Sequence, residues 1–86
     1  MGNYKVCTYI FTHFIIHPMN VGEALVALRK EKHLSQERLA YEAGLSRHFM
    51  YRLENNLANP TVKTLEKLAY ALDVKPSDIL HHAESL

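Results

Sequence analysis

The stretch LSQERLAYEAGLSRHFMYRL, at residues 34–53, is the feature that most constrains how this 86-residue chain folds. Two short runs of patterned apolar residues meet there at a single glycine, Gly44. Ser35 and Ser46 stand in front of the two runs, and serine is a favoured N-cap because its hydroxyl accepts from a free helix amide. Glycine adopts at little cost the positive φ that ends a helix. The stretch therefore predicts two short helices joined by a tight turn.

The second predicted helix has one apolar side and one polar side. Met50 and Leu53 form its buried side, and Phe49 lies on the flank. Leu45 is expected to fill the junction between the two helices. The opposite side carries Arg47, His48, Tyr51 and Arg52. Two short helices joined by a glycine-containing turn form a helix-turn-helix unit, whose second helix enters the major groove of DNA.

Positive charge gathers around this unit. From Arg29 to Arg52 the chain has six lysines and arginines and three glutamates, a local balance of +3, whereas the whole chain carries only +1. Positive charge around a predicted recognition helix is the electrostatic footprint expected for DNA phosphates. The local charge therefore indicates a nucleic-acid partner that the net charge does not.

Five helices are predicted after residue 19. Their capping or first residues are, in chain order, Asn20, Ser35, Ser46, Thr61 and Pro76. Asn20 and Glu23 match a capping box, and the first helix is expected to extend to about residue 32. His33 and Asn56 are expected to end the first and third helices in the left-handed conformation. The predicted fold is all-α, with a short fifth helix ending near residue 82. Its predicted core comprises Leu39, Leu45, Met50, Leu53, Leu65, Leu68 and Leu72.

The composition changes near Pro18. Residues 1–17 are rich in β-branched and aromatic residues and contain no Asp or Glu, which favours a β-strand. We therefore divide the chain into an N-terminal extension, residues 1–18, and a helical domain, residues 19–86. One interpretation makes the extension an upstream addition without chemistry of its own, with Met19 as the natural start. The other makes it a strand that pairs with its copy in a second subunit, because a lone strand leaves its backbone groups unsatisfied.

Composition and motifs disfavour several other classes of protein. A single cysteine, Cys7, excludes an internal disulfide framework and fits a reducing compartment. No apolar run reaches the ~18 residues of a membrane span, and no signal peptide is recognisable, so a cytoplasmic protein is expected. The sequence contains no enzyme motif and no cofactor-binding glycine loop, and its histidines lack the spacing of a metal site. We expect no enzyme activity, no cofactor and no metal.

Residues 21–80 resemble the phage Cro/repressor-type (XRE) helix-turn-helix family, which has a compact, lambda-repressor-like fold of five helices. The matching motifs are LRKEK at the end of the first helix, LSQERLA, GLS, LE, and PTVKTLEKLAYAL. The sequence departs from the family pattern at three positions. His33 and Asn56 replace the usual glycines, and Tyr51 replaces a small residue on the side that faces DNA.

The resemblance implies roles for particular residues. It implies base contacts from Arg47, His48, Tyr51 and Arg52. It implies phosphate contacts from Gln36, Ser46, Asn55 and Asn59. It also implies a structural ion pair between Arg29 and Glu54, which would join the first helix to the third. The alternative for Arg47, His48 and Arg52 is a solvated helix face.

Three functions remain open at this stage. The first is a sequence-specific transcriptional regulator that binds a near-palindromic operator in double-stranded DNA as a homodimer. The second is an antitoxin or restriction-modification controller of a two-gene module; an antitoxin would also bind a partner protein. The third is a protein-interaction module that keeps the fold without binding DNA. The expected dimer interface is apolar and C-terminal, and comprises Val74, Pro76, Ile79 and Leu80.

Overall fold

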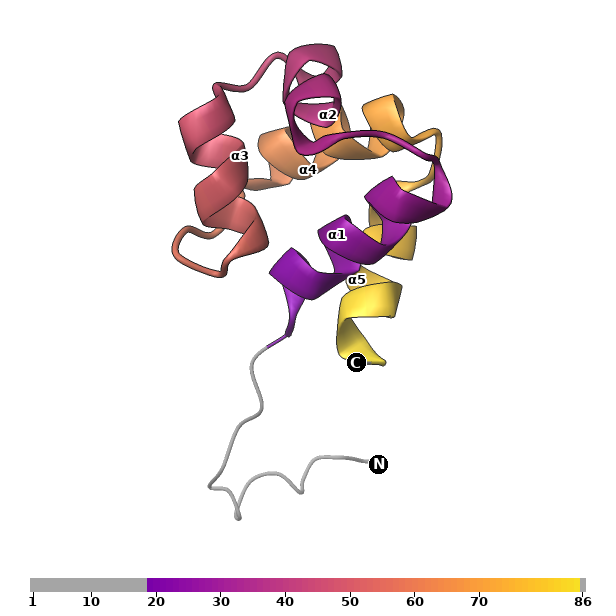
Figure 1. The fold of residues 1–86 in the computed structure, drawn as a ribbon. Coiled ribbons are helices and arrows are strands. Elements are labelled where there is room, and N and C mark those ends of the chain that lie inside the picture. Colours follow the sequence, from indigo (N-terminus) through magenta and orange to yellow (C-terminus); the bar gives the residue numbers. More distant parts are fainter. Residues whose placement is uncertain (1–18, 86) are drawn as a thin grey trace, which may run out of the picture.

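The computed structural model describes residues 19–85, and over that range the chain is helical. The helices are α1 (Val21–Glu31), α2 (Gln36–Ala43), α3 (Arg47–Glu54), α4 (Val62–Leu72) and α5 (Pro76–Glu84). In Figure 1, α2 and α3 lie at the end of the domain away from the C-terminus, and α3 forms one outer edge. The predicted all-α fold of five helices is confirmed for the described residues. The strand predicted within residues 1–18 lies outside them.

The turn between α2 and α3 forms as the sequence predicts. The Ser35 hydroxyl accepts a hydrogen bond from the backbone N–H of Arg38 at 3.0 Å, and Ser46 accepts from Phe49 at the same distance. Gly44 has a φ of +71°, so it ends α2 in the left-handed conformation. Both helices are only eight residues long. The two serine caps therefore fix where α2 and α3 start, and Gly44 fixes where α2 ends.

Within the described residues, three others also adopt positive φ. His33 and Asn56 both have a φ of 58°, as expected of residues that replace glycine at the ends of α1 and α3. Asp73, with a φ of 59°, ends α4 in the same way and was not predicted. Asparagine and aspartate tolerate this conformation better than most residues because their short polar side chains bond locally.

The predicted capping box at Asn20 and Glu23 is wrong. The Asn20 side chain makes no capping hydrogen bond; its Oδ1 accepts instead from Asn56 Nδ2 at 2.9 Å. The backbone N–H of Gly22, which a cap would have satisfied, donates to Asn56 Oδ1 at 3.1 Å. Asn56 thus caps α1 from the loop after α3. A residue 34 positions away has replaced the local cap.

Gly22 allows α1 to approach the end of α3 closely. A methyl group added at Gly22 would lie 2.6 Å from the backbone oxygen of Glu54 and 2.8 Å from that of Leu53. Such distances are shorter than a carbon–oxygen contact tolerates, so no side chain fits between the two backbones. The start of α1 is therefore fixed against the last turn of α3.

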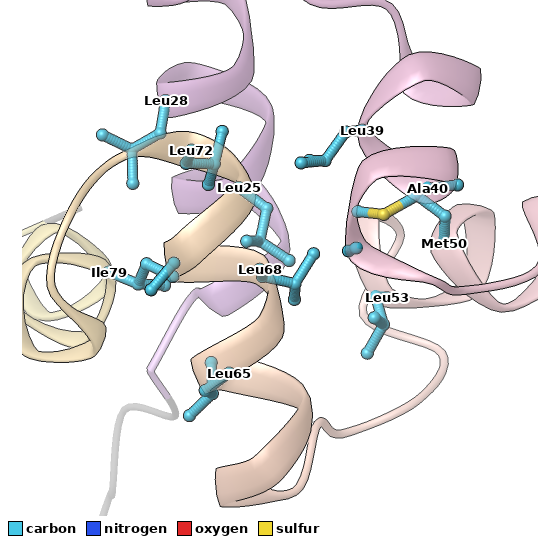
Figure 2. Packing of buried hydrophobic residues seen from close by; sticks show 12 residues of the cluster. Leu25, Leu28, Leu39, Ala40, Met50, Leu53, Leu65, Leu68, Leu72 and Ile79 are labelled. Carbon is cyan, nitrogen blue, oxygen red and sulfur yellow. The ribbon is translucent and has the colours of Figure 1, made fainter.

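One hydrophobic core lies between the five helices (Figure 2). Its fully buried large side chains are Leu25, Leu39, Met50, Leu53, Leu68, Leu72 and Ile79. Leu68 of α4 sits near the middle of the labelled cluster, with Leu25, Leu65 and Leu53 around it (Figure 2). The predicted core is confirmed except at Leu45, which is only partly buried against it.

The burial of Ile79 shows that part of the expected dimer interface is wrong. Its side chain is fully buried in the core of its own domain, so it is not available to a second subunit. Val74 and Leu80 are half-buried and pack against the same core, whereas Pro76 is exposed. The α5 helix extends to Glu84, beyond the predicted end, and packs along α1. This longer helix buries more apolar surface within the domain than the sequence suggested.

Candidate nucleic-acid interface

The outward side of α3 carries the four residues predicted to contact bases. Arg47, His48, Tyr51 and Arg52 are all exposed. Met50 and Leu53, on the inward side, are buried, and Phe49 is half-buried between the two sides. The predicted phase of the helix is therefore confirmed. A polar, exposed α3 at the edge of the domain can enter a groove without disturbing the core.

Arg47 is held by a carboxylate from the preceding helix. Its Nη2 lies 2.7 Å from Oε2 of Glu37, in the first turn of α2. The two side chains are 76% and 62% exposed, so water screens the pair and it adds little to folding stability. The contact joins the N-terminal turns of α2 and α3. Sequence reasoning missed it because residues ten apart on separate helices have no spacing rule.

Arg52 is engaged by the loop that follows α3. Its Nη2 donates to the carbonyl of Leu57 at 2.8 Å, and the Leu57 N–H donates to the Arg52 carbonyl at 2.8 Å. These reciprocal bonds tie the loop to the last turn of the helix. One Arg52 donor is therefore engaged by the loop, while the exposed guanidinium keeps further donors, so the base contact implied by the family resemblance stays a prediction.

The residues expected to contact phosphate lie at helix ends and in the loop. Ser46 and Asn59 are exposed. The Asn55 amide donates to the carbonyl of Tyr51 at 2.9 Å, closing the end of α3. Gln36, the first residue of α2, is half-buried, and its Nε2 donates to Oε1 of Glu54 at 2.8 Å. One amide hydrogen of Gln36 is thus committed to Glu54, and the other is left for a further acceptor.

Arg29 and Glu54 form the ion pair that the family resemblance implies. Arg29 Nε lies 2.7 Å from Glu54 Oε2, and its Nη2 donates to Oε1 at 3.0 Å. Arg29 Nη1 also donates to the Leu34 carbonyl at 3.0 Å. The Glu54 side chain is only 3% exposed. With Gln36, this cluster links α1, α2 and α3, and each partner satisfies polar groups that would be costly to bury alone.

Ion pairing reduces the positive charge that the sequence count suggested. Arg29 is neutralised by Glu54, Arg47 lies against Glu37, and Arg38 pairs with Glu42 at 2.7 Å. Counting as far as Glu54 lowers the local balance to +2. Among the described residues, the basic side chains of this unit without an ion pair are Lys30, Lys32 and Arg52. The electrostatic attraction for phosphates is therefore weaker than six basic residues imply.

Residues 19–85 have the features of neither a membrane span nor a metal centre. No helix in this range has the length and apolar character needed to cross a bilayer. No group of three or more His, Cys, Asp or Glu side chains within it is arranged to hold a metal ion.

The capped α2, the left-handed Gly44 and the exposed α3 define the class of this protein. Two short helices joined in this way, with the second helix presented at the edge of the domain, form a helix-turn-helix unit of the DNA-binding type (Figure 1). The sequence profile of the Cro/C1-type HTH DNA-binding domain matches residues 24–84. The chain belongs to that family, as the sequence motifs indicated.

Similar proteins include repressors and controllers. The chain is 42% identical over 62 residues to the immunity repressor protein of Bacillus phage phi105, covering 72% of this chain and 43% of the repressor. It thus spans less than half of that relative's length. The controller protein C.AhdI from Aeromonas hydrophila has a TM-score of 0.68 at 38% identity, over 71% of this chain and 92% of its own. SinR, the master regulator for biofilm formation, solved in complex with DNA, has a TM-score of 0.67 at 36% identity, over 70% and 97%.

Proposed function

We propose that this protein is a cytoplasmic, sequence-specific transcriptional regulator that binds a near-palindromic operator as a homodimer. In this proposal α3 lies in the major groove and the N-terminus of α2 approaches the phosphate backbone. The observation that carries it is the two-sided α3: its inner face is buried by Met50 and Leu53, and its outer face is polar and exposed. Membership of a DNA-binding family supports the same conclusion.

Base reading is assigned to the N-terminal part of α3. Arg47, His48 and Tyr51 extend from its exposed side. Two N–H donors on one edge of an arginine guanidinium can bond to O6 and N7 of guanine together. Arg52 is given a further role, because its bond to Leu57 orders the loop that carries Asn59. It would hold this loop near the backbone and add positive charge there.

Phosphate contacts are assigned to helix N-termini and to the loop after α3. Gln36 and Ser46 lie where free backbone N–H groups favour an anion. The bond from Gln36 to Glu54 fixes the direction of its amide and so prepares the second N–H for a phosphate oxygen. Asn55 and Asn59 would contact the backbone farther along the duplex.

Dimerisation is proposed because one recognition helix reads only a few base pairs. Two copies of α3 on one side of the duplex must lie ~34–36 Å apart to enter successive major grooves. The half-buried Val74 and Leu80 and the exposed Pro76 form the proposed interface. Ile79 is not part of it, because its own core buries it.

A second candidate is the controller of a restriction-modification module. The similarity to C.AhdI favours it, since that match covers 92% of the controller chain at 38% identity. Such a controller would still bind an operator through α3. The two candidates therefore share the DNA chemistry and differ in the genes that they regulate.

The proposal is tested by measuring affinity for a duplex selected by the protein itself. Arg47→Ala is expected to weaken binding by ~1–3 kcal/mol and to relax the preference at one base pair of each half-site. Gln36→Ala is expected to weaken binding to every duplex about equally, because phosphates carry no sequence. Lys63→Ala, on the exposed side of α4, serves as the control. Binding by the Arg47 variant at parental affinity and with parental specificity would contradict the assignment of α3.

A further inference from the structure

The contact between Glu37 and Arg47 places a negative charge at the proposed DNA interface. Glu37 is the second residue of α2, next to Gln36, and Arg47 is the first residue of α3. Their Oε2 and Nη2 atoms are 2.7 Å apart, and both side chains are largely exposed. An acidic residue beside a proposed phosphate contact needs an explanation, because it repels every duplex regardless of sequence.

Folding stability does not supply that explanation. An ion pair between two side chains this exposed contributes little to stability, since water screens the charges and both side chains lose freedom. A carboxylate in the first turn of α2 interacts favourably with the helix dipole, but this effect alone does not require contact with Arg47. The pair therefore acts mainly on the position and freedom of the Arg47 side chain.

The pair restricts Arg47 without using up its capacity to bind. A guanidinium has five N–H donors, and reading guanine takes two of them on one edge. The contact with Glu37 engages Nη2 and leaves other donors for O6 and N7 of a base. An arginine already oriented by a carboxylate also loses less rotamer freedom when it meets the base. Where the base pair is not the one that Arg47 reads, Glu37 competes with nearby phosphates for the Arg47 guanidinium.

We propose that Glu37 is a specificity-determining residue, which orients Arg47 for one base and lowers affinity for duplexes that lack it. The proposal rests on the proposed function, because it requires α3 to read bases. Glu37 acts through Arg47 and through its own charge, and it need not contact DNA. Its effect is a larger difference between right and wrong duplexes rather than tighter binding.

The test is Glu37→Gln, with Glu66→Gln as the matched control. Glu66 is an exposed residue of α4, so its substitution changes the net charge equally and leaves Arg47 untouched. Affinity is measured for the duplex selected by the parent protein, for the same duplex changed at the base pair that Arg47→Ala identifies, and for an unrelated duplex of equal length. Thermal unfolding is followed in parallel and should be nearly the same in all variants.

The Glu37→Gln protein should bind the unrelated and the changed duplexes about two- to five-fold more tightly than the parent does, which is the range of a surface ion pair. Its gain in affinity for the selected duplex should be smaller. Discrimination should fall at that base pair and nowhere else. In an Arg47→Ala background, Glu37→Gln should leave base preference unchanged.

An equal gain in affinity for all three duplexes would show that Glu37 acts only through its charge, and it would overturn the proposal. Unchanged affinities would overturn it as well. A parent protein that selects no duplex would instead contradict the proposed function, so the two failures are distinguishable.

Discussion

Substitution of Gly22 by alanine tests the close contact between α1 and α3. The added methyl group would lie 2.6 Å from the backbone oxygen of Glu54 and 2.8 Å from both the Leu53 oxygen and Asn56 Oδ1. Two of these atoms belong to backbone at the end of a helix, so they cannot rotate away as a side chain would. Either α1 or the last turn of α3 must move.

The expected cost follows from three contributions. Forcing a methyl group into a packed contact typically costs ~1–3 kcal/mol. Displacing α1 weakens the bond from the Gly22 N–H to Asn56, which is worth about 0.5–1.5 kcal/mol. Alanine restores roughly 0.5–1 kcal/mol relative to glycine inside a helix. The net loss is about 1–3 kcal/mol, which lowers the melting temperature by ~4–8 °C per kcal/mol in a domain of this size.

Thermal and urea unfolding of the purified variant measure this loss. Glu23→Ala is the control, because Glu23 is the next residue of α1 and its side chain is exposed. It should unfold close to the parent midpoint. A Gly22→Ala protein with an unchanged or higher midpoint would show that α1 does not approach α3 as closely as described. The explanation of Asn56 as a long-range cap would then fail as well.

Two other outcomes are expected. Leu53→Ala removes a fully buried side chain from the last turn of α3, so it should lower the free energy of unfolding by ~2–5 kcal/mol. An unchanged midpoint in thermal unfolding would place Leu53 outside the core. A chain starting at Met19 should still sediment as a dimer and bind the same selected duplex, because the proposed C-terminal interface is intact. A truncated chain that stays monomeric at all accessible concentrations would instead move the interface to residues 1–18.

The sequence predicted the features of the fold that local rules determine. Ser35, Ser46 and Gly44 have strong preferences for the positions that they occupy, so α2, α3 and the turn could be located in advance. His33 was predicted to be left-handed from its position after the first helix, where glycine is more usual, and Asn56 from the tolerance of asparagine for that conformation. The phase of α3 followed from Met50 and Leu53, because one apolar face requires the other face to be polar.

The predictions that failed depended on contacts between distant residues. The cap of α1 comes from Asn56 rather than from Asn20, and no local pattern marks such a replacement. Ile79 was counted as surplus apolar surface because no local pattern shows how α5 packs against α1 and α4, and this side chain is buried in its own core. The bond from Arg52 Nη2 to the Leu57 carbonyl, only five residues on, was also not predicted, and the base contact of Arg52 stays a prediction.

The electrostatics of the candidate site were the least predictable part. A count of charges along the chain treats each arginine as available to DNA. In the folded protein Arg29 belongs to a buried cluster with Glu54 and Gln36, and Arg47 is held by Glu37. The tertiary structure decides which acidic and basic side chains form pairs. The sign of the local net charge was therefore predictable, but which basic side chains stay unpaired was not.

Selection of duplexes from a random pool by the purified 86-residue protein is the most direct test of sequence-specific binding as a homodimer. We expect that one sequence is enriched, that it is an inverted repeat, and that its half-sites are centred ~10–10.5 base pairs, or a multiple of that, apart. Selection by the Arg47→Ala protein should lose the preference at one symmetric pair of positions. A pool that remains random after repeated rounds would contradict sequence-specific binding, and enrichment of a single unrepeated half-site would contradict the dimer.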